Sequence, residues 1–242
     1  MRVLELWRYP VKSLQGERLA EAELGPEGVT GDRQWALFDV DTGYGLTARR
    51  VPELLFATAR LRPGGGDVDV VLPDGTVTGD DDRISAWLGR RVTLRPAGDP
   101  FVRPRYESPD DDLAEAAGAT ARWHDWQGAA GAFHDNADGR VSLVTTGSLG
   151  DWDRRRFRAN VVLDGGSDAD LVGRRVRLGE AVLDVNVPIP RCVMVTRPQP
   201  GGIGRDTSVL KTIHRERDGE LAVAALVREA GTVRTGDVLE PV

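Results

Sequence analysis

Cysteine, lysine and long apolar runs are scarce in this sequence of 242 residues. The single cysteine, Cys192, excludes an internal disulfide and an iron–sulfur cluster, which needs several thiolates. No apolar run approaches the roughly 18 residues of a membrane-spanning helix, and the first residues lack a basic stretch followed by an apolar one. We therefore expect a cytoplasmic protein without a membrane partner, whose thiol is a core side chain, a nucleophile or a metal ligand.

The charge balance argues against nucleic acid as a partner. The formal net charge is −6 at pH 7, whereas binding to a phosphate backbone normally needs a basic excess. Lysine occurs only at Lys12 and Lys211, so arginine supplies nearly all of the positive charge. The 29 glycines and 14 prolines imply many turns and short elements, which favours β structure over a helical bundle.

Alternating apolar residues predict a series of strands in the first hundred residues. These strands are expected at residues 3–9, 18–24, 34–40, 54–61 and 68–72. A helix is expected from Asp81 to Leu88, because Asp80 offers an N-cap oxygen and Gly89 suits the left-handed position that ends a helix.

A proline-rich, polar stretch at residues 96–112 predicts a boundary between two lobes, residues 1–97 and 113–242. In the second lobe, strands are expected at residues 141–145, 158–163, 174–187 and 192–196, helices at 147–155 and 207–215, and a closing hairpin of 221–227 with 233–239. The expected fold is therefore α+β, mainly β with short helices.

Several stretches that look like binding motifs lack the context that such sites need. Residues 39–43 begin like a calcium loop without its later ligands, and residues 201–204 lack the strand and helix of a dinucleotide site. His124, His134 and His214 are too scattered for a zinc site. We interpret these stretches as a turn, a loop and structural histidines.

The segment with the most chemical content is residues 187–196, where Cys192 follows two prolines and Arg191. A neighbouring guanidinium favours the thiolate, which is the form that binds soft metals or attacks electrophiles. Taken alone, a single cysteine in an apolar segment is more often a core residue.

Six further stretches occur in a recognisable order around this segment. They are residues 6–13, 31–38, 47–54, 143–149, 156–163 and 231–237. With Cys192, they resemble the MOSC family in the form that carries an N-terminal MOSC β-barrel module, a family that includes amidoxime-reducing molybdoenzymes. The resemblance covers essentially the whole chain and implies a MOSC-type β-barrel preceded by a β-barrel-like lobe.

The resemblance implies a molybdenum cofactor, with Cys192 as the metal ligand and the catalytic residue. The residues that it assigns to cofactor binding are Lys12, Ser13, Arg33, Thr145, Ser148, Arg158, Asn160, Arg191 and Cys192. It implies no pyridoxal phosphate, because no segment resembles the domain that holds that group in molybdenum cofactor sulfurases.

Each part of the cofactor needs a different partner. Lys12 and Arg33 are expected to neutralise its phosphate. Residues 145–148 are expected at a helix N-terminus, where free N–H groups favour an anion. Arg158 and Asn160 would share one face of a strand and contact the pterin or the phosphate, the simpler alternative being a surface salt bridge and a turn.

The activity that the resemblance implies is a molybdenum-dependent reduction of N-hydroxylated compounds. Because the sequence has neither iron–sulfur ligands nor a flavin motif, a separate ferredoxin-like or flavin-linked protein is expected to supply electrons. The alternative is a module that carries sulfur as a Cys192 persulfide or only binds and delivers the cofactor. Pro190 and Ala224 stand where some relatives carry hydroxyl groups, and we expect these differences to change either cofactor binding or substrate preference.

Overall fold

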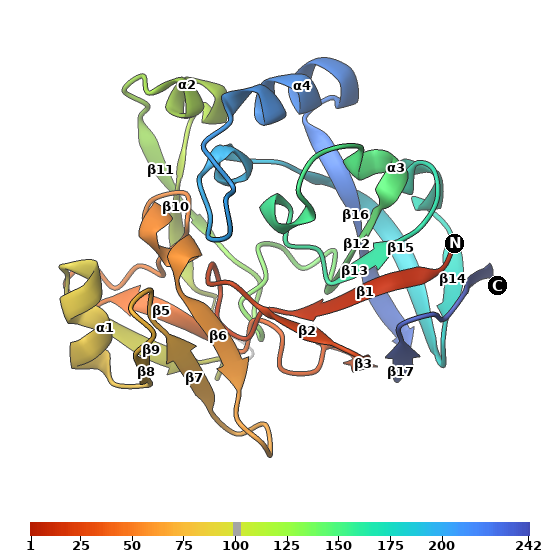
Figure 1. Ribbon diagram of the computed structural model, residues 1–242, viewed down its shortest axis with the longest axis horizontal. Coiled ribbons are helices and arrows are strands. Elements are labelled where there is room, and N and C mark those ends of the chain that lie inside the picture. The colour runs from red at the N-terminus through yellow and green to blue at the C-terminus, as the bar shows by residue number, and fades with distance from the viewer. Residues whose placement is uncertain (99–102) are drawn as a thin grey trace.

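The computed structural model describes residues 1–98 and 103–242, and an eight-stranded sheet forms its centre (Figure 1). The strand order is β18 (Leu239–Pro241), β14 (Arg175–Leu178), β15 (Ala181–Pro190), β16 (Glu220–Glu229), β12 (Val141–Thr145), β13 (Val161–Leu163), β1 (Val3–Arg8) and β2 (Glu17–Leu19). β12 and β13 run parallel, and the other neighbours are antiparallel.

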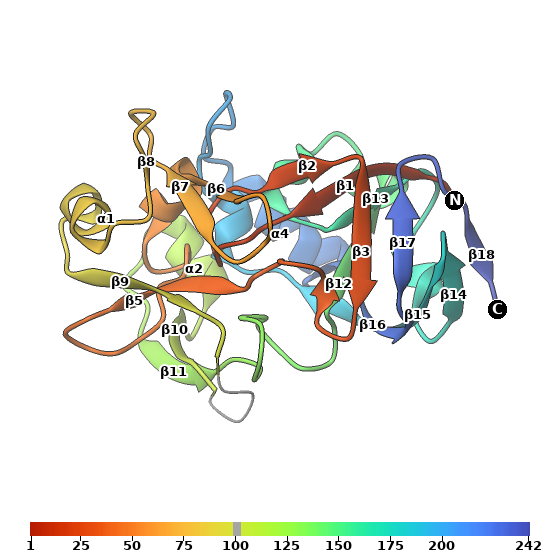
Figure 2. The ribbon, with the colours of Figure 1, turned by 90° about the horizontal axis from the view of Figure 1, so that it is seen from below.

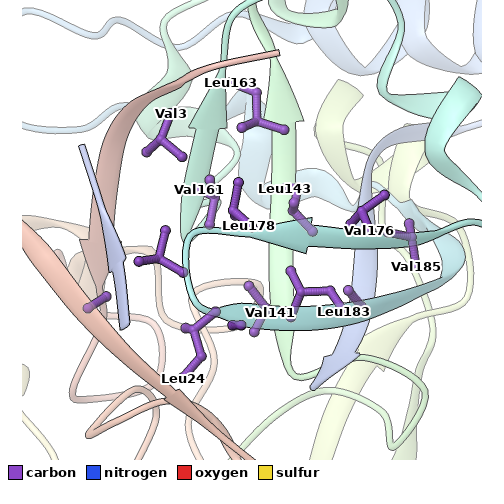
Figure 3. Packing of buried hydrophobic residues seen from close by; sticks show 14 of the residues in the cluster. Val3, Leu24, Val141, Leu143, Val161, Leu163, Val176, Leu178, Leu183 and Val185 are labelled. Atoms are coloured by element: carbon purple, nitrogen blue, oxygen red, sulfur yellow. The ribbon is translucent and has the colours of Figure 1, made fainter. Parts of the chain in front are cut away.

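Different partners bury the two faces of this sheet. Because successive side chains of a strand point to opposite faces, Val141 and Leu143 of β12 enter one apolar cluster and Val144 enters another. Figure 3 shows the first cluster, which the curved sheet encloses. The second lies beneath α4 (Thr207–Arg217) and the 3₁₀ turn η4 (Val193–Thr196).

The N-terminal half builds a third apolar cluster, around Leu14, Leu37 and Leu54. Its strands are β5 (Trp35–Asp39), β6 (Thr58–Leu61), β7 (Val68–Val71), β8 (Val77–Thr78) and β9 (Val92–Pro96). β3 (Glu21–Gly25) instead pairs with β4 (Gly28–Val29) and with β17 (Gly231–Arg234) near the end of the chain. The predicted α+β class, mainly β with short helices, is confirmed.

The opening strand ties the two halves together. β1 pairs with β13, so that Leu6 lies opposite Val161, and the chain then continues into the N-terminal cluster at Val11. Figure 2 shows α1 (Asp81–Leu88) with β6 to β9 at one end and the strands of the large sheet at the other. The division into lobes at residues 1–97 and 113–242 stays a prediction.

Residues 103–128 form an arm between the two halves. It consists of β10 (Arg105–Pro109), α2 (Asp112–Ala117) and β11 (Trp123–Gln127), and β10 pairs with β11. The stretch predicted as a linker, residues 96–112, therefore contains a strand, while residues 99–102 lie outside the described residues. Alternation did not reveal this hairpin, because its side chains are mostly polar or half-buried.

Two predicted strands begin as 3₁₀ turns instead. Residues 52–56 form η1 (Pro52–Phe56) because a proline at the first turn favours a helical start, and only Thr58–Leu61 is a strand. Residues 193–196 form η4, with Cys192 as its N-cap, so the prediction of a strand at 192–196 was wrong.

Other boundaries differ for local reasons. The helix expected at 147–155 is only α3 (Thr146–Leu149), because Gly150 takes a positive φ of 54°. The strand expected at 158–163 starts at Val161, because Arg158 has a φ of 53°. The run at 174–187 turns back at Gly179 to form the β14–β15 hairpin, whereas the helix predicted at 207–215 is confirmed as α4.

The predicted closing hairpin is also wrong. β16 pairs with β12 and β15, whereas β17 continues beyond it to pair with β3. Gly231 is required by close packing rather than by a turn, since a Cβ there would lie 2.6 Å from the carbonyl carbon of Glu180. Within residues 1–98 and 103–242, no helix combines the length and hydropathy needed to cross a bilayer.

The caps of α1 provide a test of the local analysis. Asp80 accepts a hydrogen bond from Arg83 N at 2.9 Å, and Gly89 ends the helix with a φ of 63°, as predicted. We expect Asp80→Ala to lower the free energy of unfolding by about 1 kcal/mol, because it removes the acceptor of a helical N–H. Asp80→Asn retains an acceptor and should stay within about 0.3 kcal/mol of wild type in urea unfolding. Equal losses in both variants would contradict this role.

Candidate functional site

One cavity of about 160 Å³ lies where the N-terminal half meets the large sheet. Seven of the nine predicted cofactor residues line it: Lys12, Ser13, Arg33, Arg158, Asn160, Arg191 and Cys192. At about 30 Å³ for each water molecule, the cavity has room for about five of them, and its polar lining suits a polar ligand. The structure thus gathers into one place residues that are up to 180 positions apart in the sequence.

Cys192 lies on the cavity wall, directly after β15. Val193 and Val195 enter the cluster beneath α4, while Met194 packs against the N-terminal cluster, so the turn after Cys192 joins both halves of the molecule. The cysteine is partly exposed rather than sealed among aliphatic side chains. Its sulfur is therefore accessible to a metal or an electrophile from the cavity.

A cluster of charges surrounds Lys12, which is 6% exposed. Its ammonium donates to Phe133 O at 3.0 Å, forms an ion pair with Asp135 and lies 4.7 Å from the Tyr106 ring centroid. Burial lowers the pKa of Lys12, and the Asp135 carboxylate opposes that shift. Burial favours a raised pKa for Asp135, but Lys12 and Arg49 outweigh it and hold that pKa well below its usual range.

Arg49 connects this cluster with the thiol. Its guanidinium donates to Ser108 Oγ at 2.9 Å and lies 3.4 Å from Asp135 Oδ2. Burial alone would lower the pKa of Arg49, but Cys192 and Asp135 raise it above its ordinary value. Arg49 therefore stays protonated beside the thiol.

Tyr9 separates two further cations. The guanidinium of Arg33 lies 5.5 Å from the Tyr9 ring centroid and that of Arg158 lies 4.3 Å from it, both within cation–π range. Arg33 also pairs with the fully buried Asp32, whose Oδ1 accepts from Tyr9 N at 2.7 Å. Burial raises the pKa of Tyr9 to about 12, so its hydroxyl stays neutral.

Arg158 is 5% exposed, and its Nη1 atom has no hydrogen-bond partner among residues 1–98 and 103–242. Burial lowers the pKa of Arg158 to about 10, so it remains a cation at neutral pH. A buried guanidinium N–H without an acceptor costs free energy, which an anion in the cavity would recover. This atom is the strongest sign that the cavity is built for an anionic ligand.

Backbone strain is concentrated around the same cavity. Ser13, Arg33 and Arg158 take positive φ values of 70°, 52° and 53°. Only two other non-glycine residues in the described chain do so, Asp218 and Ala222. Left-handed backbone costs a non-glycine residue about 1 kcal/mol, and such strain is typical of functional sites.

Asn160 and Arg191 reach the cavity while serving the fold. Asn160 Oδ1 accepts from Ser142 Oγ at 2.8 Å and its amide donates to Trp7 O at 3.2 Å, which links β12 to β1. Arg191 donates to Phe157 O at 2.6 Å, but its Nε atom has no partner. Burial lowers the pKa of Arg191 to about 10.

The structure does not bring Thr145 and Ser148 to this cavity. Thr145 Oγ accepts from Ser148 N at 3.1 Å and so caps α3, while Ser148 Oγ accepts from Asp168 N at 3.1 Å. These side chains are committed to local bonds, and a helix of four residues offers little dipole to an anion. We therefore assign both residues a structural role.

Sequence reasoning also missed residues that line the cavity. They are chiefly Thr47, Arg49, His134, Asp135 and Arg140. Arg49 stands within the family-like stretch at 47–54, which was a usable signal, whereas Asp135 lies in a segment without any pattern. Within residues 1–98 and 103–242, no group of three or more His, Cys, Asp or Glu side chains is arranged to hold a metal ion.

The charges of the lining residues indicate what this cavity can bind. Among the described residues, six cations line it, Lys12, Arg33, Arg49, Arg140, Arg158 and Arg191, and so does one carboxylate, that of Asp135. Asp32 and Glu27, which are not among the lining residues, pair with Arg33 and Arg140. Arg140 Nη1 and Thr47 Oγ1 are also buried without hydrogen-bond partners. The donor set fits a phosphate-bearing group next to one soft ligand, Cys192.

His134 makes the free energy of unfolding depend on pH. Burial, with Arg33 beside it, lowers the pKa of His134 to about 3, and its Nε2–H donates to Glu27 O at 3.2 Å. Below the ordinary pKa of 6.5 the unfolded chain therefore binds a proton that the folded chain does not, so stability falls on acidification. Between about pH 7.5 and about pH 5 we expect a loss of about 2 kcal/mol from this group.

The matched variant is His134→Gln, which keeps an N–H for Glu27 O but does not titrate. In urea unfolding at both pH values, it should lose about 2 kcal/mol less on acidification than wild type. The same pH dependence in both proteins would contradict a buried neutral imidazole.

Several solved structures are similar to this chain. Among solved structures, the chain resembles YiiM from Escherichia coli, with 18% identity over 45% of this chain and 57% of that chain and a TM-score of 0.35. It also resembles the YUAD protein from Bacillus subtilis, with 11% identity over 98% of this chain and 93% of that chain and a TM-score of 0.44. A third structure, titled a hypothetical protein, has 18% identity over 45% of this chain and 54% of that chain and a TM-score of 0.36. The chain thus spans little more than half the length of the first and third of these structures. Comparison with curated proteins gives no match.

Two family models match the sequence. The one described as the MOSC N-terminal beta barrel domain matches residues 1–90, and the one described as the MOSC domain matches residues 130–240. Together they cover most of the sequence in the order that the resemblance predicted. The chain therefore belongs to the family of MOSC-domain proteins that carry an N-terminal MOSC β-barrel domain.

Proposed function

We propose that this protein binds a molybdenum cofactor in the cation-lined cavity, with Cys192 as the protein ligand of the metal, and reduces N-hydroxylated compounds. MOSC domains are linked to molybdenum-cofactor binding in general, which supports the first part. The observation that carries the proposal is the partly exposed thiol on the wall of a cavity with an unpartnered, buried Arg158 Nη1.

The cavity residues divide by the part of the cofactor that suits them. Cys192 is the soft ligand. Arg33, Arg158 and Arg191 carry planar guanidinium groups, whose paired N–H donors suit phosphate oxygens. Because burial leaves the pKa of Arg158 and of Arg191 at about 10, both keep their charge throughout the neutral range. Lys12 uses two of its three donors within the protein and has one left for a ligand.

The chemistry requires two electrons and two protons: an N-hydroxylated amine becomes an amine and water. The cofactor, when bound, supplies the two-electron redox step. The protein orients the substrate beside Cys192, limits the access of water and keeps positive charge next to the oxygen that leaves. Electrons come from a separate ferredoxin-like or flavin-linked protein, so the purified chain should not turn over with NAD(P)H alone.

The test expresses the protein in a host that makes the cofactor, then measures bound molybdenum and benzamidoxime reduction with an artificial electron donor. We expect Cys192→Ala to lose at least 10-fold in activity and most of its metal, because the soft ligand is gone. Its urea unfolding should stay within about 0.5 kcal/mol of wild type, since the side chain is partly exposed. Full activity in this variant would contradict the proposed role of Cys192.

The same preparations separate reduction from sulfur transfer. A sulfur carrier would keep its cofactor in Cys192→Ala but lose a cyanide-releasable sulfur atom, whereas a reductase would lose turnover. Wild-type protein that holds molybdenum but does not reduce benzamidoxime or other N-hydroxylated compounds would leave binding intact and contradict the proposed reaction.

Arg158 offers a second test of the anion site. Arg158→Gln should weaken cofactor retention about 10- to 100-fold, because a charged hydrogen bond to phosphate is worth about 1.5–3 kcal/mol. Arg155→Gln is the matched control, since Arg155 lies three residues away but pairs with Asp153 outside the cavity. Equal retention in the two variants, measured as molybdenum content after dialysis, would speak against a phosphate contact at Arg158.

A further inference from the structure

The arm, residues 103–128, lies outside both family matches, which end at residue 90 and resume at residue 130. It nevertheless contacts the side of the cavity that holds the thiol. The Tyr106 ring lies against Lys12 Nζ at 4.7 Å, and Ser108 accepts a hydrogen bond from Arg49. A segment that neither match covers therefore touches two of the cations that line the cavity.

The turn after Cys192 lacks the usual local cap. Cys192 occupies the N-cap position of η4, and its side chain makes no capping hydrogen bond. The first N–H groups of such a turn have no partner within it, and a serine or aspartate at the cap normally supplies one. Here the N–H of Val193 is accepted by Asp112 Oδ1 at 2.8 Å, from 81 residues away in the sequence.

Asp112 is free for this task because its own helix does not need it. The N-cap of α2 is Asp111, whose Oδ1 accepts from Leu113 N at 2.8 Å and Ala114 N at 3.0 Å. The Asp112 carboxylate is thus available to a distant N–H. The bond is charge-assisted, so it is stronger than a bond between neutral groups.

The backbone is also held on the other side of the thiol. Arg191 N donates to Gly219 O at 2.8 Å, and Cys192 O accepts from Val195 N at 3.2 Å. Together with the Asp112 bond, these contacts hold the peptide group that follows Cys192 and the peptide group that precedes Arg191. The sulfur makes none of these bonds and remains available to the cavity.

The element that carries Asp112 is itself anchored to the segment after the thiol. Glu115 pairs with Arg197 at 2.8 Å, and Arg205 donates to Ala116 O at 2.6 Å. Ala116 is fully buried in the same apolar cluster as Val193. Asp112 therefore stands on a fixed support rather than on a free loop. Figure 1 shows α2 beside α4 at this end of the molecule.

We propose that Asp112 is the positioning residue of the cysteine site: its carboxylate caps the turn that follows Cys192, which holds the sulfur toward the cavity and leaves it free to act as a ligand. The claim that Asp112 holds the thiol stands on the contacts above, and its consequence for the metal rests on the proposed function.

The test uses the full chain without cofactor, because Cys192 is its only thiol and alkylation by iodoacetamide reports on that residue alone. At about pH 8, the fixed turn presents the sulfur to the reagent only through the cavity, whereas a loosened turn also lets the sulfur move out of it, so the alkylation rate rises with access. We expect Asp112→Ala to raise this rate at least threefold. Asp112→Asn keeps an acceptor oxygen for Val193 N and should raise it less than threefold.

Asp111→Ala is the matched control, because it removes the cap of α2 but not the bond to Val193. It should lower stability in urea unfolding and change the alkylation rate less than threefold. A rise below threefold in Asp112→Ala, or of threefold or more in Asp112→Asn or Asp111→Ala, overturns the proposal. If Asp112→Ala does not fold, Asp112→Ser, whose hydroxyl is too short to reach Val193, is judged by the same threshold.

In the protein that carries cofactor, Asp112→Ala should release molybdenum at least threefold faster than Asp111→Ala. If wild type binds no molybdenum, the proposed function fails, whereas the alkylation rates still decide whether Asp112 holds the thiol. If the alkylation rates meet the thresholds but the release rates do not differ, the role of Asp112 in retaining the metal is overturned.

Discussion

The constraint on which this structure depends is positive charge that is buried without enough negative charge beside it. In the described part of the chain, six cations face one cavity with one lining carboxylate, Asp32 and Glu27 pair with only two of these cations, and Arg158 has an N–H group without an acceptor. Such an arrangement costs free energy, and the left-handed backbone at Ser13, Arg33 and Arg158 adds to that cost. A fold keeps these features when a ligand recovers the cost, and an anion bound here would stabilise the folded chain by mass action.

The topology makes this concentration of charge possible. β1 belongs to the large sheet through β13, and the chain passes from it directly to Lys12 at the start of the N-terminal cluster. The turn after Cys192 crosses the same junction from the other side, because Val193 and Met194 pack into different clusters. Packing within two apolar clusters thus brings the cations and the thiol to one place, and neither half of the chain alone would form the cavity.

How much of this was predictable differs from residue to residue. Cys192 and Arg158 reach one cavity as expected, but the strand alternation invoked for Arg158 and Asn160 is wrong, since Arg158 lies in a left-handed turn. Thr145 and Ser148 occupy a capping pattern that in sequence looks the same whether a helix N–H or an anion is the partner. Sequence patterns reveal local hydrogen bonding, whereas the cavity depends on contacts between distant segments.

The arm shows why some contacts of the cavity residues escaped prediction. Its strands are mostly half-buried and polar, so they lack alternation, yet Tyr106 lies against Lys12, and Trp126 lies 5.4 Å from the guanidinium of Arg49. The predicted cofactor residues that line the cavity all come from the two matched domains, whereas the arm contacts Lys12 and Arg49. Changes in the arm can therefore shift Lys12 and Arg49 while Arg33, Arg158 and Arg191 keep their contacts within the two matched domains.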